Sequence, residues 1–264
     1  MRRGLAALVL VLALAGCGGG GGGRGAGSAS GGSIAQAAAK SSRAGSVKTD
    51  FTVQGSGAKG IGTGVFNTGK DRSGRLTMEL EVNGRKSTLE SIVTGNVLYM
   101  RSPVFAQAGF AGRQEWVKLD LAKLARQRGI GLSSLVNASP TPNSVLAYLR
   151  GAGKVENRGS ETVRGVKTTH YHVNVDLERA AGRADAATAE SIRRVIRLSG
   201  LKKLPVDAWV DDHGYLRKVK WAEHTSPQQS AQVTMELYDF GPPVEIKPPP
   251  PDKVVDLLER LGGG

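Results

Sequence analysis

The chain has 264 residues, of which 39% are apolar, and its 36 Lys and Arg against 23 Asp and Glu give a net charge of +13. This length and apolar content allow one large domain or two small ones and exclude a mainly disordered chain. The single cysteine excludes an internal disulfide and the cysteine-rich frameworks of zinc-binding and disulfide-stabilised domains.

The N-terminus has the features of an export signal. A basic start, Met1 to Arg3, precedes the apolar stretch Leu5 to Ala15, which is too short to span a bilayer as a helix. The cysteine, Cys17, follows Leu-Ala-Gly and resembles the lipobox of bacterial lipoproteins, in which this cysteine is acylated, palmitate included, and becomes the first residue. A buried structural cysteine is the alternative, but a glycine tract follows it. We predict a signal peptide over 1–16 and lipidation of Cys17.

Residues 17–33 form the next unit. Ten of these 17 residues are glycine, so the segment has no face that could pack and is predicted to be a flexible tether. Two or more acyl chains on one cysteine give durable anchoring, whereas a single chain binds only marginally. We therefore expect the mature protein, with a net charge of +11, to stay lipid-anchored at the outer face of the plasma membrane, in the cell envelope.

Past the tether, Ser33 can cap a helix through Ala44, and a single domain over 34–247 follows. The pattern then changes to short strands. The eleven predicted strands are Val47–Gln54, Ile61–Asn67, Leu76–Asn83, Lys86–Val93, Val97–Arg101, Glu115–Leu119, Val155–Val163, Lys167–Asp176, Val206–Asp211, Tyr215–His224 and Ser230–Asp239.

Turn residues and alternation support this strand assignment. Asn83 and Gly84 both accept a positive φ, which predicts a tight hairpin, and Asp211 to Gly214 indicate a second turn. Leu76, Met78, Leu80 and Val82 alternate with polar residues, which predicts a sheet with one apolar and one wet face.

Helical patterns lie between the strand groups. Amphipathic helices are predicted over Asp120–Arg128, Asn143–Arg150 and Asp185–Ser199. Residues 248–264 form a separate C-terminal segment. Its prolines, 248–251, must be extended, and Asp252 can cap a last helix with an apolar stripe.

A long antiparallel sheet with one apolar face twists and curls around its helices. The sequence therefore predicts an α+β fold, in which a curved, half-barrel antiparallel sheet of about eleven strands wraps around a few helices. Its interior is either filled or hollow, and the low aromatic content of 5% favours a cavity. The predicted wall residues are Val53, Val65, Leu76, Met78, Leu80, Leu89, Tyr99, Leu146 and Ile196.

Several segments in this order carry a family resemblance. They are the lipobox, Val47–Phe51, Val97–Pro103, Trp116–Asp120, Gly165–Val173, Leu204–Asp211 and Tyr238–Gly241. Together they resemble the LppX/LprG type of actinobacterial lipoproteins and, more distantly, the carriers LolA and LolB. The resemblance covers nearly the whole chain. It implies a cavity that holds acyl chains and a role in moving lipids or glycolipids. Pro248 to Gly264 depart from this pattern, and we expect them to pack on the domain or to cover the cavity mouth.

Motifs for other chemistry are weak. Gly55 to Gly60 match G-x-G-x-x-G, but a glycine-rich strand follows where a dinucleotide site needs a helix. The polar run Asp211 to Gly214, which includes His213, fits a hairpin turn, and His224 fits a loop. No serine lies in a G-x-S-x-G motif. We therefore expect no enzyme and no cofactor.

His170 and His172 flank Tyr171, so in a strand they point the same way. With a carboxylate they could hold a metal or serve an exported hydrolase. Surface or half-buried histidines on a hairpin are the favoured interpretation, and we expect no metal site.

The basic charge could suggest nucleic acid, but export and anchoring make that an improbable target. Basic side chains near an anionic bilayer gain about 1 kcal/mol each. The densest candidates for contact with an anionic membrane surface or headgroup are Arg193, Arg194, Arg197, Lys202 and Lys203. A solvated helix face is the equally weighted alternative.

The leading hypothesis is a membrane-anchored lipoprotein that binds lipid or glycolipid acyl chains in a hydrophobic cavity and carries them within the cell envelope. A membrane transporter is a further expected partner. The alternative is an envelope interaction or sensor lipoprotein with the same fold and a filled core.

Overall fold

The computed structural model describes residues 31–55, 58–68, 73–82, 84–110, 114–128, 142–184, 186–226 and 229–262. The predicted signal peptide, the lipidation site Cys17 and the tether up to residue 30 lie outside these described residues. Residues 31–33, predicted as the end of the tether, instead begin the first helix.

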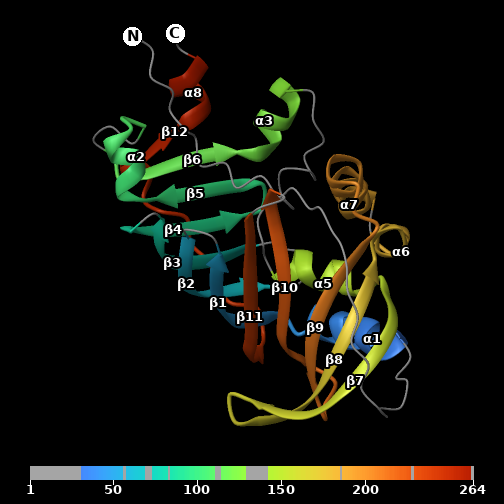
Figure 1. Ribbon diagram of the computed structural model, residues 1–264. Coiled ribbons are helices and arrows are strands. Elements are labelled where there is room, and N and C mark those ends of the chain that lie inside the picture. Colours follow the sequence, from blue (N-terminus) through green and yellow to red (C-terminus); the bar gives the residue numbers. More distant parts are fainter. Residues whose placement is uncertain are drawn as a thin grey trace.

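In the described part of the chain, twelve strands form one open, curved sheet (Figure 1). The strand order is β12-β6-β5-β4-β3-β2-β1-β11-β10-β9-β8-β7. All neighbours are antiparallel except β12 and β6, which are parallel. The strands are β1 (Ser46–Gly55), β2 (Ala58–Asn67), β3 (Ser73–Val82), β4 (Arg85–Thr94), β5 (Val97–Arg101), β6 (Trp116–Asp120), β7 (Ala152–Val163), β8 (Val166–Asp176), β9 (Lys203–Asp211), β10 (Leu216–Ser226), β11 (Gln229–Gly241) and β12 (Val254–Asp256). The eleven predicted strands are confirmed, and β12 is additional.

The helices are α1 (Gly31–Ser41), α2 (Pro103–Gln107), α3 (Leu121–Arg128), α5 (Pro142–Leu149), α6 (Leu177–Gly182), α7 (Ala186–Ser199) and α8 (Leu257–Gly262), with a 3-10 turn, η1, at Pro251–Lys253. The predicted helices between the strand groups correspond to α1, α3, α5 and α7, whereas α2 and α6 were not predicted. The C-terminal helix was predicted from Asp252, and this is wrong. It begins at Leu257, because Val254–Asp256 pair with β6 as a strand.

The register of the strands fixes which side chains share a face of the sheet. Phe51 lies opposite Met235, which lies opposite Val219, and all three are buried. We call the face that carries these residues the inner face and the opposite one the outer face. Figure 1 shows α1, α5, α6 and α7 gathered beside β7–β10, while α2, α3 and α8 lie toward β5 and β6.

The core lies where these helices cover the inner face. Ile34 of α1, Leu146 of α5 and Ile192 of α7 are at most 1% exposed and belong to one cluster with Val173 and Met235. Burial of such a side chain contributes about 1.5–3 kcal/mol relative to an exposed position. The β7–β11 half of the sheet therefore has a filled interior.

Two predicted turns are confirmed. Val82 pairs directly with Arg85, and Gly84 between them has a φ of 78°. The N–H of Gly214 donates to the carbonyl of Asp211 at 2.9 Å, and Gly214 has a φ of 77°. His224, in contrast, lies within β10, so its prediction as a loop residue is wrong.

The segment 242–262, which we call the C-terminal strap, packs on the domain. The Asn67 side chain donates to the Val244 carbonyl at 2.8 Å and accepts from its N–H at 2.9 Å. Since Val254 pairs with Trp116 of β6, the residues in between cross β3, β4 and β5. Asn67 alternates with inner-face residues of β2, which places this crossing on the outer face. Ile92, on that face, is 5% exposed.

Candidate functional site

The inner face of β1–β4 carries a group of half-buried apolar side chains. Leu76, Met78 and Leu80 alternate along β3 with outward-facing polar residues. The register places Met78 opposite Leu89 of β4, and it places Val53 opposite Gly60, which in turn faces Leu80. Five of the predicted wall residues therefore share one face, as alternation predicted.

These five residues divide into two groups according to their packing. Val53 and Leu76 pack against the core cluster, whereas Met78, Leu80 and Leu89 lie outside it. The helices α1 and α6 contact strands among β7–β10. The inner face thus changes from a filled core at one end of the sheet to partly exposed apolar side chains at β3 and β4.

Glycines on β2 bring β3 unusually close to it. Gly60, Gly62 and Gly64 lie on the inner face, directly opposite Leu80, Met78 and Leu76. A Cβ at Gly62 would lie 2.6 Å from Met78 Cγ, and one at Gly60 would lie 2.9 Å from Leu80 Cδ2. The apolar side chains of β3 therefore pack directly on the glycine backbone of β2, and together they form one apolar surface.

Two predicted wall residues are on the other face. Val65 lies opposite Lys48 and Arg75, and Tyr99 lies opposite Ile92 and Lys118, so both point outward. The prediction that they share a face with Leu80 is wrong, because neighbouring residues of a strand point to opposite faces.

The helical members of the predicted wall lie in or beside the core. Leu146 of α5 is 1% exposed within the core cluster, and Ile196 of α7 is half-buried against it. These two side chains are therefore neighbours of the filled half of the sheet.

The sequence analysis missed three inner-face residues further along the sheet. Leu98 and Met100 of β5 lie opposite Val93 and Ser91 of β4, and Leu119 of β6 lies opposite Leu98. All three are half-buried. Gly95 and Asn96 form the turn between β4 and β5 and fix the register of these two strands. Pairing the strands through this turn would have selected Leu98 and Met100 in place of Tyr99.

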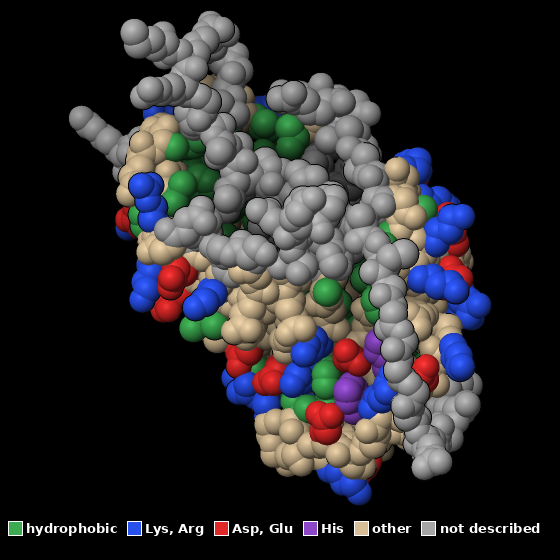
Figure 2. Space-filling model, in the orientation of Figure 1, with side chains coloured by type: hydrophobic (Ala, Val, Ile, Leu, Met, Phe, Trp, Pro, Cys, Tyr) green, Lys and Arg blue, Asp and Glu red, His purple; other side chains and the backbone are tan. Residues whose placement is uncertain are grey.

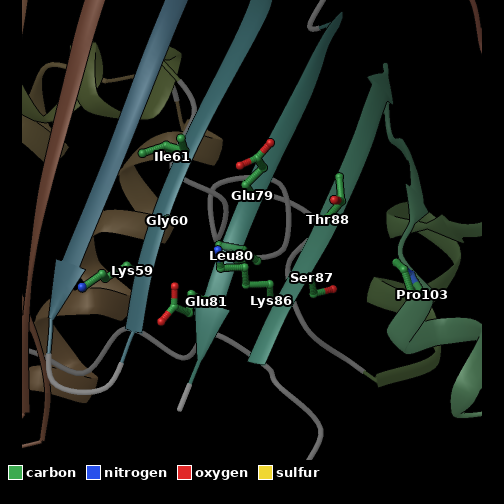
Figure 3. A pocket seen from close by; sticks show the side chains of 10 residues that line it. All are labelled: Lys59, Gly60, Ile61, Glu79, Leu80, Glu81, Lys86, Ser87, Thr88 and Pro103. Atoms are coloured by element: carbon green, nitrogen blue, oxygen red, sulfur yellow. The ribbon is translucent and has the colours of Figure 1, made fainter. Parts of the chain in front are cut away.

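A hollow of about 510 Å³ lies at the ends of β2, β3 and β4, beside the first residue of α2. Its lining includes Lys59, Glu81 and Lys86, which lie opposite one another across the three strands, together with Leu80 and Pro103 (Figure 3). Lys59, Glu81 and Lys86 belong to the outer face, whereas Leu80 belongs to the inner face, so the hollow takes its lining from both faces at the strand ends.

The predicted basic patch lies on and after α7. Arg193, Arg197, Lys202 and Lys203 are exposed, and Arg197 pairs with Glu190 at 2.8 Å. The side chain of Arg194 lies outside the described part of the structure. Figure 2 shows Lys and Arg side chains along the right side of the molecule, where Figure 1 places α6 and α7.

His170 and His172 lie on the outer face, on the same side of β8 as predicted. Both ring systems approach Asp207 Oδ1, at 3.0 Å from His170 Nε2 and 3.1 Å from His172 Nδ1. The Trp209 indole donates to Glu161 at 2.8 Å and this hydrogen bond lowers the pKa of Glu161. His170 stacks on Trp209 with 4.2 Å between ring centroids. Within the described residues, no group of three or more His, Cys, Asp or Glu could hold a metal ion.

None of the helices in the described part of the chain is both long enough and apolar enough to span a membrane.

Comparison with known proteins gives a consistent family assignment. Residues 34–246 match the model of the LppX_LprAFG lipoprotein family. An uncharacterised 31.2 kDa protein of Streptomyces griseus is 30% identical over 165 residues, which are 60% of this chain and 53% of the relative. The match thus spans about half the length of that relative. A Streptomyces coelicolor protein whose name marks it as a candidate lipoprotein is 28% identical over 83% of this chain and 72% of its own length.

Two crystal structures share the fold at low sequence identity. LprF from Mycobacterium bovis has a TM-score of 0.50 at 14% identity, covering 83% of this chain and 96% of that chain. LppX from Mycobacterium tuberculosis has a TM-score of 0.50 at 13% identity, covering 82% of this chain and 97% of that chain.

Proposed function

Because the chain belongs to the LppX_LprAFG lipoprotein family, we propose that it binds lipid or glycolipid acyl chains on the inner face of its sheet and carries them within the cell envelope. The observation that supports this function best is the row of half-buried apolar side chains Leu76, Met78 and Leu80 beside the glycines of β2. The role proposed is binding, without catalysis.

The free-energy cost of exposing an acyl chain to water explains why such an apolar surface would be useful. A 16-carbon chain costs roughly 12 kcal/mol in water, at about 0.8 kcal/mol per buried CH₂. Free diffusion of a lipid between membranes is therefore negligible. A protein that shields the chain with Met78, Leu80 and Leu89 removes part of that barrier, because apolar side chains replace water around the chain.

The proposal also states how the protein is anchored and at which membrane surface it works. Acylation of Cys17 would hold the protein at the outer face of the plasma membrane, and the glycine-rich tether would let the domain approach or leave that surface. The exposed Arg193, Arg197, Lys202 and Lys203 would favour anionic lipid. A membrane transporter that supplies or receives the lipid is a proposed partner.

The test is to extract the full-length chain from its native envelope and to measure co-purifying lipid by native mass spectrometry. Leu80→Asn places a polar amide on the inner face, and we expect it to lower lipid occupancy several-fold. The matched control is Val244→Asn, since Val244 is 38% exposed beside Asn67 and does not line the hollow that contains Leu80. We expect this control to keep its lipid.

The alternative, an envelope interaction or sensor lipoprotein with a filled core, gains weight from Leu146 and Ile192, which are each 1% exposed. In that case the unsubstituted chain carries no lipid and takes up none from vesicles. Leu80→Asn would then change only the free energy of unfolding. This outcome would contradict the carrier function.

A further inference from the structure

The segment Pro103–Phe110, which we call the α2 segment, presents apolar side chains at the surface. Val104 is 52% exposed, and Phe105 and Phe110 are half-buried. No residue of α2 is buried. The sequence from Ser102 to Gly112 contains no charged residue. Single exposed apolar residues are ordinary, but a contiguous apolar group marks an interaction site.

The α2 segment holds its shape through its own backbone. The N–H of Phe105 donates to the Ser102 carbonyl at 3.1 Å, and that of Ala108 donates to the Val104 carbonyl at 3.0 Å. The N–H of Phe110 donates to the Phe105 carbonyl at 2.9 Å. The segment is therefore ordered without burial of its side chains. Its backbone polar groups are already partly satisfied, which lowers the cost of entering an apolar medium.

The neighbours of the α2 segment carry the complementary features of a membrane contact. Pro103 lines the same hollow as Leu80, an inner-face side chain near the end of β3 (Figure 3). Exposed Arg85 and Lys86 lie at the adjacent end of β4, and Lys59 is exposed two strands away. Glu79 and Glu81 of β3 lie between them, so these three basic side chains leave a small excess of positive charge. Basic side chains next to exposed apolar ones match the charge and polarity of an anionic bilayer interface.

We propose that the α2 segment inserts into the interface of an anionic bilayer and so places the Leu80 end of the inner face against the lipid. This inference deepens the proposed function and rests on it. The thirteen residues between Cys17 and Gly31 give fourteen Cα–Cα steps, which reach no further than about 50 Å when fully extended. An acylated Cys17 therefore keeps the domain close to a bilayer at all times, which favours a lipid surface over a protein as the occupant.

The experiment uses the full acylated chain on vesicles of phosphatidylglycerol and phosphatidylethanolamine. A polarity-sensitive fluorophore is attached to a cysteine introduced as Val104→Cys. The acylated Cys17 has no free thiol, so the label goes to the introduced position. We expect a blue-shifted emission that is quenched by a quencher carried on the lipid chains.

Val244→Cys is the matched control, because Val244 is a second exposed valine, 38% exposed, at the far end of β2 beside Asn67. We expect its label to keep the emission that it has in water. The same water-like emission at both positions would overturn the proposal. Burial of the label at residue 104 only after an envelope protein extract is added would also overturn it, in favour of a protein partner.

A second readout separates docking from lipid carriage. Val104→Asp should lower the initial rate of lipid uptake from the vesicles about tenfold, as expected for the loss of one inserted apolar side chain, whereas Val244→Asp should not. An unchanged rate for Val104→Asp would overturn delivery through the α2 segment. If the label at residue 104 enters the bilayer but the chain never takes up lipid, the docking surface stands and the proposed carrier function fails.

Discussion

Gly62 shows how closely two strands approach on the inner face. Its neighbours leave no room for a methyl group, because a Cβ would lie 2.6 Å from Met78 Cγ and 2.8 Å from the backbone oxygen of Thr77. The methionine side chain can move, but the backbone oxygen is held in the β2–β3 ladder. Glycine at position 62 therefore allows Met78 of β3 to pack directly on the backbone of β2.

Gly62→Ala should consequently lower the free energy of unfolding by about 1–3 kcal/mol, the usual cost of overpacking. Chemical denaturation measures this change. Gly182→Ala is the control, since its Cβ would meet none of the described atoms within 4 Å, and its effect should stay within about 0.5 kcal/mol. Equal stability of the two variants would show that β3 can move away from β2 without cost.

At the scale of single residues, the sequence predicted faces well where apolar and polar residues alternate clearly, and poorly in the glycine-rich β2, which holds Val65, and in the short β5. Leu76, Met78 and Leu80 alternate over most of β3, so their shared face could be predicted. β5 has five residues, and Tyr99 stands between Leu98 and Met100, so apolar residues occupy both faces. Only the pairing with β4 shows that Tyr99 points outward.

At the scale of secondary-structure elements, the largely buried carboxylate of Asp256 holds the C-terminal strap to the sheet. Lys118 Nζ lies 3.0 Å from Asp256, whose side chain is 10% exposed. The N–H groups of Leu258 and Glu259 also donate to this carboxylate, at 3.0 and 3.4 Å. Burial alone would raise the pKa of Asp256, but the Lys118 hydrogen bond and the two amides outweigh it and lower the pKa.

Asp256→Asn should therefore loosen β12 and α8. We expect faster amide hydrogen exchange in both elements, equivalent to about 1–2 kcal/mol of lost local stability, because hydrogen bonds to a charged group become neutral ones. The exposed Asp252 of η1 provides the control, Asp252→Asn. Equal exchange in the two variants would show that packing alone holds the strap.

The pH dependence of the strap has a defined sign. The pKa of Asp256 is lowered in the folded state, so its contribution is fully present above the ordinary value of 3.8 and is lost as the pH falls through the folded value. Exchange in β12, taken relative to the intrinsic exchange rate at each pH, should accelerate below about pH 4 in the parent chain and change less in Asp256→Asn. An identical acceleration in both would assign it to another group.

The same strap shows why element prediction failed at the C-terminus. Val254, Leu257 and Leu258 have helical spacing, which predicted one helix from Asp252. The edge of β6 offers free backbone groups, and Val254–Asp256 pair with it instead. Pairing with a strand more than a hundred residues away leaves no local signal in the sequence. The missed α2 is only five residues long and begins at Pro103, so its periodicity was too short to detect.

For the whole molecule, the important asymmetry is between the two halves of the sheet. The β7–β11 half carries α1, α5, α6, α7 and the filled core, whereas the inner face of β3, β4 and β5 carries partly exposed apolar side chains. Figure 1 shows α2 and α7 on either side of the upper end of the molecule. A bilayer at that end could meet the α2 segment through apolar contact and the basic residues of α7 through charge.

Charge reversal of Arg193 on α7 and Lys203 at the start of β9, which we call the α7 variant, tests this arrangement. The double substitution Arg193→Glu with Lys203→Glu should slow lipid uptake from anionic vesicles about tenfold or more at low salt, since each basic side chain near the surface contributes about 1 kcal/mol. At 1 M salt the Debye length falls to about 3 Å, so the parent and the variant should become similar. Stopped-flow transfer of a fluorescent lipid measures both rates.

The matched control reverses two exposed basic residues of the edge strand β7, Lys154→Glu with Arg158→Glu, which changes the net charge by the same amount. If the position of the charge matters, the control should lose much less of its uptake rate than the α7 variant. Equal losses would mean that only the net charge of the domain attracts it to the bilayer, and α7 would then have no special place in docking. The apolar α2 segment would remain the sole feature that orients the inner face toward the lipid.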